Sequence, residues 1–204
     1  MLSRWKEVVM SPAEIDPASG CRIPLPRRED LDPEGQKAFD FYTSGTLRGL
    51  HGPAGIWLHS PKLAELYQPL GTYLRSGAGL DERVREVCVM ATAREFNNAF
   101  EWAAHEREAN HVGVPQEVIQ SIKFREPSTG IEEPFGTVVE LIREAFTAGS
   151  VSAATYDAAV SLLGVPLLID LMSLAGMYAS TAALLTVFDM QLDAGETHLL
   201  PPLE

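Results

Sequence analysis

The acid–base side chains with the most suggestive spacing lie between residues 80 and 114, in the stretch LDERVREVCVMATAREFNNAFEWAAHEREANHVGV. Glu101 and His105 are four residues apart, so on a helix they share one face and can hydrogen-bond. Such a bond holds the imidazole tautomer and leaves the other ring nitrogen free to exchange a proton with a substrate. Glu86, on the preceding segment, adds a second carboxyl group. These three residues are the predicted catalytic set.

Glu86 has two interpretations in this pattern. It falls beside an apolar stripe formed by Leu80, Val84, Val87, Cys88 and Ala91. A carboxyl group among apolar neighbours has its pKa raised by desolvation, which would let Glu86 supply a neutral carboxyl. The pattern alone favours the other interpretation, a glutamate at the edge of the stripe that extends to water or pairs with Arg83 or Arg94.

The predicted second helix carries a polar line made of Asn98, Glu101, His105, Glu108 and Val112. Spacing alone favours a solvated face for this line, with a favourable Glu–His pair on it. Trp102 lies next to Glu101 and well away from the small-residue apolar face of the same helix. Its position indicates a helix that is covered on more than one side.

The sequence lacks the motifs of nucleophilic, phosphate-binding, metal-dependent and thiol chemistry. The chain has no GxSxG motif and no glycine-rich phosphate loop, and Glu-x-x-His does not occur on each of two helices, as carboxylate-bridged metal bundles need. We therefore expect neither a metal site nor a cofactor. The two cysteines, Cys21 and Cys88, form no CxxC pair, and Cys88 is expected to be a small buried apolar residue.

Charge and the N-terminal sequence favour a cytoplasmic protein without nucleic-acid or membrane partners. The 204 residues are 46% hydrophobic and carry a formal net charge of −12, which opposes binding to nucleic acid or to an anionic membrane. The N-terminal residues lack the apolar run of a signal peptide, so a cytoplasmic location is expected. The apolar run 166–189 is long enough to span a membrane, but its small residues and Asp170 favour a central bundle helix or an oligomer interface.

Capping residues divide the chain into predicted helices. No segment of the sequence alternates between apolar and polar residues as a strand would. Residues 1–32 are rich in Pro and charge and are predicted to form an extended arm, followed by a single helical domain over 33–195 and an extended tail over 196–204. Helices are expected at 33–42, from Pro61 to Gly77, at 81–95, 98–111, 115–122, 135–149, 152–163 and 166–189. The fold class is all-α.

Three segments resemble the carboxymuconolactone decarboxylase and alkylhydroperoxidase D-like superfamily. They are the hairpin 80–114 with its FEWAAH run, the preceding GPAGIWLHSPKLAE, and LIDLMSLAGMYASTAALLTVFDMQLDAG near the end. The resemblance spans about residues 52–195. It implies an alkylhydroperoxidase D-like helical bundle built on a central hairpin, assembled as a dimer, trimer or hexamer.

The resemblance also assigns roles to residues. The peroxidase branch has a Glu followed by a Cys-x-x-Cys-x-x-x-His run; Glu86 and His105 match its Glu and His, while Asn98 and Glu101 stand where the cysteines would be. A disulfide relay cannot run without thiols. The resemblance further implies that the Glu101–His105 line faces the active-site cavity. Asn98, Trp102, His59, Trp57, Arg94 and Tyr178 are the expected substrate-binding residues, with Arg94 as the cation for a carboxylate.

Three functions follow as hypotheses. The first is a thiol-independent lyase (a decarboxylase) or isomerase that acts on a small carboxylated or lactone-like ring compound, with His105 moving the proton, Glu101 orienting it and Glu86 exchanging a second one. The second is a peroxidase-like oxidoreductase, which the missing CxxC pair opposes. The third is a helical binding or assembly protein without catalysis.

Overall fold

The structure is a computed structural model that describes residues 14–44, 49–193, 195–197 and 199–202. Within these residues the chain is mostly helical and contains no strand, and the only β-type pairing is an isolated bridge between Asp16 and Cys21. The predicted all-α class is confirmed. The alkylhydroperoxidase D-like bundle stays a prediction.

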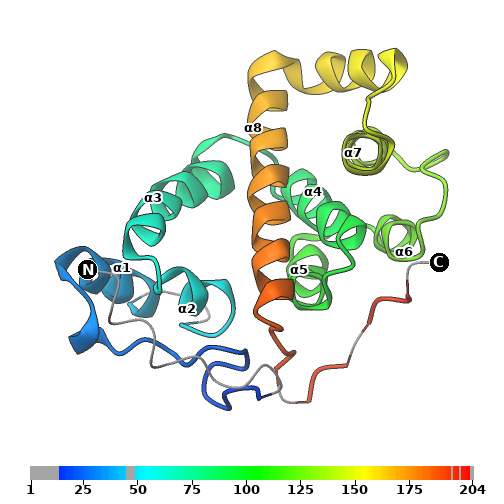
Figure 1. Ribbon diagram of the computed structural model, residues 1–204. Helices are drawn as coiled ribbons and strands as arrows, with labels where there is room; N and C mark the ends of the chain where they lie inside the picture. Colours follow the sequence, from blue (N-terminus) through cyan, green and yellow to red (C-terminus); the bar gives the residue numbers. More distant parts are fainter. Residues whose placement is uncertain (1–13, 45–48, 194, 198, 203–204) are drawn as a thin grey trace. The chain divides into compact units, whose positions relative to one another are not determined.

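The helices follow one another along the chain with short connections (Figure 1). They are η2 (Arg28–Asp30), α1 (Pro33–Thr43), α2 (Pro53–Trp57), α3 (Pro61–Thr72), η3 (Tyr73–Gly77), α4 (Glu82–Glu95), α5 (Ala99–Val112), α6 (Gln116–Phe124), α7 (Phe135–Arg143), η4 (Glu144–Ala148) and α8 (Ala153–Val187). Here η3 and η4 are single π-helical turns that extend α3 and α7.

The predicted caps set the helix boundaries. The side chain of Asp32 caps α1, that of Asp81 caps α4, and that of Asn98 caps α5, each by accepting a hydrogen bond from a backbone N–H of the first turn. Gly113 ends α5 in the left-handed conformation that glycine adopts without strain. The predicted helices from Asp32 onward are confirmed to within a few residues, including the predicted pair 152–163 and 166–189, which meet inside α8.

The chain divides into two compact units, which are described separately. The first contains the described residues up to Leu70 together with Leu184–Gly195, and the second contains Gly71–Ala183 and the end of the chain from Glu196. The predicted domain 33–195 is therefore shared between both units, and its behaviour as a single domain stays a prediction. Residues 1–13 of the predicted arm lie outside the described residues.

The first unit has a small core between α1, α2 and the start of α3. Its buried members are Ala38, Tyr42, Ala54, Leu58 and Ala64. The described part of the arm lies against the segment that follows α8, because the N–H of Arg22 donates to the carbonyl of Phe188 and the N–H of Gln191 donates to the carbonyl of Gly20. These backbone bonds hold the arm to this unit.

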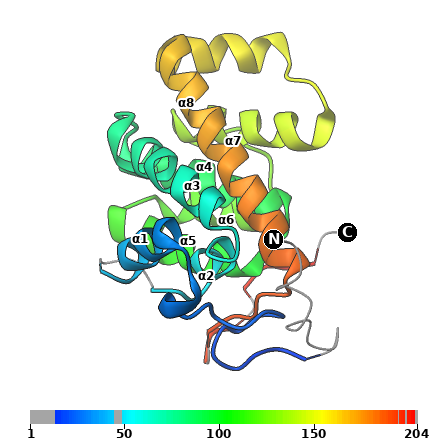
Figure 2. The same ribbon diagram turned by 60° about the vertical axis from the view of Figure 1, so that its left-hand side comes forward.

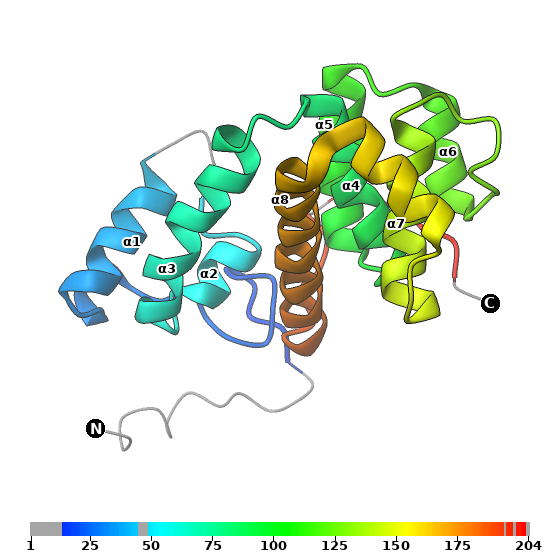
Figure 3. The same ribbon diagram turned by 90° about the horizontal axis from the view of Figure 1, so that it is seen from above.

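The second unit is built around α4, which packs against α5, α6 and α7 (Figures 1 and 3). Almost every residue of α4 from Val84 to Arg94 is buried, and small side chains such as Cys88 and Ala91 let the neighbouring helices approach closely. Leu171 and Leu174 of α8 complete this core. A helix buried on all sides must pair its few charged groups internally, which places α4 at the centre of the candidate site.

The long helix α8 consists of two straight segments that meet at an angle (Figure 2). The break lies at Gly164, whose φ of 70° and ψ of 159° are not helical. Pro166 follows, and because proline lacks the N–H group that would continue the hydrogen-bond ladder, the second segment starts there. Among the described helices, α8 alone is long and apolar enough to cross a membrane by length and composition, which is weak evidence because core helices of soluble proteins pass the same test.

Trp102 tests the packing of the second unit. Its side chain is completely buried, so Trp102→Ala should lower the free energy of unfolding by about 3–5 kcal/mol through lost burial and a residual cavity. Urea denaturation followed by circular dichroism measures the loss. Phe124→Ala, an aromatic truncation at a side chain that is 54% exposed, is the matched control and should change stability by about 0.5 kcal/mol or less. Equal losses in the two variants would contradict this account of the core.

Candidate acid–base site

The structure brings the three predicted catalytic residues together. His105 on α5 lies between Glu86 on α4 and Glu101 one turn earlier on its own helix. The distance from His105 Nδ1 to Glu86 Oε2 is 2.6 Å, and that from His105 Nε2 to Glu101 Oε2 is 3.5 Å. The imidazole therefore has a carboxylate at each ring nitrogen.

A tight turn between α4 and α5 produces this geometry. Asn97, in the left-handed region with a φ of 47°, reverses the chain, and Asn98 then starts α5. The two helices run back alongside each other, so a residue two turns before the end of α4 faces one two turns into α5. Glu86 and His105 occupy these positions.

All three side chains lie inside the protein. Glu86 is 3% exposed and Glu101 4% exposed, and the His105 side chain is 17% exposed. The expectation of a solvated face for the Glu101–His105 line is therefore wrong, as is that of an edge glutamate at position 86. Spacing places residues on a common face of a helix, but the direction of that face depends on packing.

Glu86 is paired with a different arginine from those expected. Nε of Arg85 lies 3.1 Å from Glu86 Oε1, whereas Arg83 lies near Asp81 and over the ring of Phe135. Neighbouring residues on a helix do not normally face each other, so no spacing rule identifies this contact. With Arg85 and His105, both oxygens of Glu86 have cationic partners.

These contacts set the charge of the site. Burial disfavours a charged imidazole, but the hydrogen bonds and negative charges of Glu101 and Glu86 outweigh it and raise the pKa of His105 to about 9. Burial likewise acts to raise the pKa of Glu86, yet His105 and Arg85 together lower it below its usual value. The expected neutral Glu86 is thus wrong, and at neutral pH His105 is an imidazolium beside an ionised Glu86.

The geometry also reassigns the orienting group. The short contact to Glu86 Oε2 fixes Nδ1 of His105, while Nε2 lies at the longer distance of 3.5 Å from Glu101. Glu101 was expected to orient the ring and leave the second nitrogen free. Glu86 instead makes the shorter contact, and Glu101 makes the longer one, at the other ring nitrogen.

Tyr178 and Arg75 extend the cluster. The Tyr178 ring meets the His105 ring edge to face, with centroids 5.0 Å apart, as expected for a residue beside the site. Burial raises the pKa of the Tyr178 hydroxyl, and Arg75, which hydrogen-bonds it, opposes that shift. The residue Arg75 is exposed as a whole, but its guanidinium is partly desolvated beside Tyr178, and its carbonyl accepts a hydrogen bond from Arg85. The site thus has a further cation linked to a buried acid–base pair.

Arg75 and Arg85 were missed by sequence reasoning. Arg75 sits on η3, the π-helical turn after α3, and reaches Tyr178 on α8, about a hundred residues later in the chain. A single-sequence pattern contains no signal for such a contact. Arg85 directly precedes Glu86 in the sequence, but helical spacing gave no reason to choose it as the partner of Glu86.

Asn98 and Trp102 make contacts that stabilise the fold. The Asn98 side chain accepts a hydrogen bond from the Glu101 N–H at 3.0 Å and donates one to the Ala182 carbonyl at 3.1 Å. Trp102 is fully buried, and its Nε1–H donates to Glu106. The expectation that α5 is covered on more than one side is confirmed. Both side chains have structural partners, and their contact with a substrate stays a prediction.

Arg94 does not lie at the acid–base cluster. Its guanidinium donates to Asn97 at 2.7 Å, and its charge interacts with Glu95 and Arg125. It stands two turns beyond Glu86 on α4, about 12 Å further along the helix axis. The arginines at the cluster are Arg75 and Arg85, and the contact of Arg94 with a substrate stays a prediction.

Trp57 and His59 belong to the first unit. Trp57 packs against Tyr42 and Tyr67, and Nε2 of His59 lies 2.8 Å from the carbonyl oxygen of Pro24. The acid–base cluster lies in the second unit. Their roles as walls of the site stay predictions.

The two thiols are poorly placed for redox chemistry. Cys88 has no exposed surface, and burial raises the pKa of its thiol to about 12. Cys21 is 2% exposed and lies in the arm of the first unit. Neither thiol is accessible to solvent.

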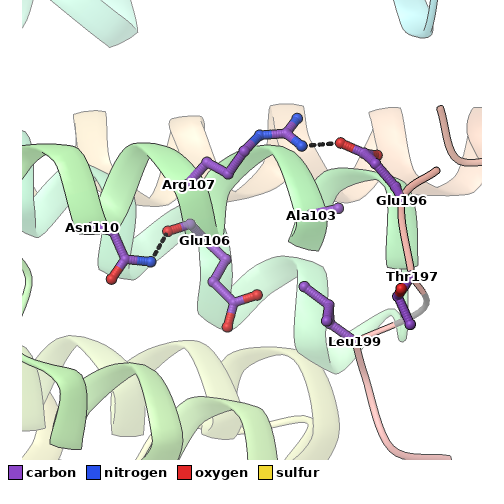
Figure 4. A pocket seen from close by; sticks show the side chains of 7 residues that line it. All are labelled: Ala103, Glu106, Arg107, Asn110, Glu196, Thr197 and Leu199. Atoms are coloured by element: carbon purple, nitrogen blue, oxygen red, sulfur yellow. Dashed lines mark hydrogen bonds and ion pairs between the residues drawn. The ribbon is translucent and has the colours of Figure 1, made fainter. Parts of the chain in front are cut away.

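A pocket on the second unit is lined by residues of α5 and of the end of the chain (Figure 4). By helical spacing, Ala103, Arg107 and Asn110 lie on the opposite side of α5 from Glu101 and His105. The volume of the pocket is about 260 Å³, and it is lined by Ala103, Glu106, Arg107, Asn110, Glu196, Thr197 and Leu199. Its charged groups are paired internally, Arg107 with Glu196 and Glu106 with Trp102. Among the described residues, no group of three His, Cys, Asp or Glu side chains could hold a metal ion.

Comparison with protein-family models and curated proteins identified no relative. A scan against protein-family models and a search of curated proteins both gave no match. The chemistry of the site therefore has to be argued from its own geometry.

The raised pKa of His105 predicts a pH dependence of stability. Its contribution is fully present below the ordinary histidine pKa of about 6.5 and is lost as pH rises through about 9. The difference in unfolding free energy between the wild type and His105→Gln should therefore shrink by on the order of 3 kcal/mol between pH 6 and pH 10. Urea denaturation at both pH values measures this change.

His111→Gln is the control for that experiment, because His111 is an exposed histidine at the end of the same helix. Its stability difference from the wild type should stay constant over the same pH range. A His105→Gln difference that also stays constant would contradict the carboxylate–imidazolium–carboxylate arrangement.

Proposed function

We propose that this chain is a carboxymuconolactone decarboxylase-like enzyme, a thiol-independent lyase or isomerase that acts on a small carboxylated or lactone-like ring compound. The observation that carries the proposal is the buried His105 held between Glu86 and Glu101. Buried acid–base groups with shifted pKa values, linked to an exposed cation, are typical of catalytic sites. The resemblance of the α4–α5 hairpin to that superfamily gives further support.

The three residues have separate tasks in this proposal. Glu86 holds His105 through the 2.6 Å bond at Nδ1 and stabilises its positive charge. His105 is protonated at rest, so its Nε2–H acts as a general acid toward a substrate atom that displaces the Glu101 carboxylate from its contact with Nε2. Glu101 accepts a proton in the isomerase version of the reaction and restores the imidazolium in the decarboxylase version.

A decarboxylation balances with this set of groups. The bond between the ring and its carboxylate breaks, CO₂ leaves, and the electron pair moves into a conjugated carbonyl of the ring. His105 protonates the resulting enolate oxygen or carbon through Nε2, so one proton replaces the carboxyl group. Solvent returns that proton to His105 by way of Glu101. Neither an oxidant nor a thiol takes part.

The charge of the site favours a carboxylated substrate. Arg75, Arg85 and the His105 imidazolium face the carboxylates of Glu86 and Glu101, which leaves one positive charge in excess. The rest of the chain is acidic, with a formal net charge of −12. Arg75 is the exposed member, and its planar guanidinium can bind a carboxylate through two N–H groups. We assign substrate-carboxylate binding to Arg75 in place of Arg94.

The buried thiols support the thiol-independent version of the proposal. A peroxidase of this superfamily would need a reactive cysteine pair, and the corresponding positions hold Asn98 and Glu101. Asn98 caps α5 and Glu101 contacts His105, so both positions have other partners here.

Substitution of the acid–base pair tests the proposal. Glu101→Gln and His105→Ala should each lower turnover of the responsive substrate by at least 10²-fold, because each removes a group that transfers a proton. Release of CO₂ from a panel of carboxylated lactones and unsaturated ring acids is the measurement, with loss of ring absorbance as the second readout. Glu108→Gln, at an exposed carboxylate of the same helix, is the control and should retain full turnover.

Two results would contradict the assignment. One is an absence of turnover by the wild-type chain across the whole panel. The other is equal turnover in Glu101→Gln, His105→Ala and Glu108→Gln, with circular dichroism showing all three folded.

We also propose that the chain forms a homo-oligomer, a dimer, trimer or hexamer, through α8. Three large apolar side chains of this helix, Leu162, Val165 and Ile169, are at least 45% exposed. Exposed apolar surface of this kind is typical of an interface between subunits.

Ile169→Glu tests the interface, because it places a charge on a side chain that is 60% exposed. Light scattering after size-exclusion chromatography should give an oligomer for the wild type and a smaller species for the variant. Gln120→Glu adds the same charge to an exposed position of α6 and should leave the mass unchanged. A wild-type monomer, or an unchanged mass for Ile169→Glu, would contradict this interface.

A further inference from the structure

A second group of charged side chains lies where α4, α6 and α7 end. It contains Arg94 and Glu95 from the last turn of α4, Arg125 from the end of α6 and Arg143 from the end of α7. We call these four residues the arginine cluster. Within the described residues, no ion pair or hydrogen bond joins it to Glu86, Glu101 or His105, so it is separate from the acid–base site.

Arg143 is accounted for by its structural contacts. It donates hydrogen bonds to the carbonyls of Glu126 and Ser121 at 2.6 and 3.1 Å, which satisfies acceptors at the end of α6. The carboxylate of Glu140 also faces it. The positive charge of Arg143 is therefore balanced locally.

Arg94 and Arg125 share a single carboxylate. Glu95 is almost completely buried, and its Oε2 lies 2.9 Å from Arg125 NH2 at ion-pairing distance but without hydrogen-bond geometry. Arg94 is 3% exposed, donates to Asn97 through NH1, and has a buried Nε–H with no acceptor. A buried donor without an acceptor costs free energy, which an added acceptor nearby would recover.

The positive charges also repel one another. Burial lowers the pKa of Arg94, and the charge of Arg125 lowers it further. Burial and the charge of Arg125 also lower the pKa of Arg143. An anion near Arg125 would relieve this repulsion and complete the charge balance that Glu95 only begins.

Access from solvent runs through Arg125. Its side chain is 36% exposed, and its pairing with Glu95 involves NH2. The remaining guanidinium N–H groups can form the two parallel hydrogen bonds that carboxylate and phosphate groups accept from arginine. Phe96 follows Glu95 in the chain, is 40% exposed and packs edge to face on Phe146, so an apolar surface flanks the cluster.

We propose that the arginine cluster is a binding site for a small oxyanion, either a carboxylate or a phosphate, held by Arg125 with Arg94 behind it. The site is independent of the proposed function, because it shares no residue with the acid–base cluster. The apolar flank suits a carboxylate carried on an aromatic or aliphatic body.

Isothermal titration calorimetry with benzoate and with inorganic phosphate, at constant ionic strength, tests the site. Arg125→Gln should weaken binding of the preferred anion about tenfold or more, because it removes charge-assisted hydrogen bonds. Arg27→Gln removes an exposed, ion-paired arginine of the first unit and should leave the affinity unchanged. Tighter binding of benzoate would identify a carboxylate ligand, and tighter binding of phosphate a phosphorylated one.

Two further variants keep the test decisive. Arg125→Lys keeps the charge but loses the planar fork, so it should weaken binding severalfold even if Arg125→Gln does not fold. Glu108→Gln, at an exposed carboxylate of α5 outside both clusters, should leave this binding unchanged. The proposal is overturned if the wild type binds neither anion, or if the Arg125 variants bind as tightly as Arg27→Gln.

Discussion

The hydrogen bond between His105 Nδ1 and Glu86 Oε2 is the interaction on which the second unit depends. It joins α5 to α4, the helix around which this unit is packed, and it does so where water is largely excluded. Burying ions is costly unless each has partners, and removing one member of such a pair typically costs about 3–5 kcal/mol. Arg85 and Glu101 supply the remaining partners. The contacts with Glu86 and Glu101 offset the cost of burying the imidazole. The same contacts raise its pKa and keep it protonated.

This arrangement gives the site an order. Glu86 is enclosed by two cations and holds the imidazole through Nδ1, whereas Glu101 lies further away, at Nε2. Tyr178 covers the imidazole and connects it to Arg75 at the surface. The arginine cluster at the far end of α4 repeats the pattern of a buried carboxylate among arginines, but it has an excess of cations and no histidine, which suits binding better than proton transfer.

Much of the fold could be predicted from the sequence because its signals are local. Asp32, Asp81 and Asn98 mark helix starts through a side chain that caps its own helix, and Gly113 marks an end through its backbone freedom. The pairing of Glu101 with His105 is equally local. The orientation of their face was predicted wrongly from spacing, since burial depends on what packs against α5. Arg75 and Arg85 were missed for the same reason: these contacts depend on how distant helices meet and on which way a side chain turns.

The protonation state of His105 at neutral pH tests the account most directly. Nuclear magnetic resonance of ¹⁵N-labelled imidazole reports whether each ring nitrogen carries a proton. Both nitrogens of His105 should be protonated at pH 7.5, the ring should titrate with a pKa of about 9, and Glu86→Gln should lower this pKa. A neutral His105 at pH 7.5, with a pKa near the ordinary value of about 6.5, would contradict this expectation.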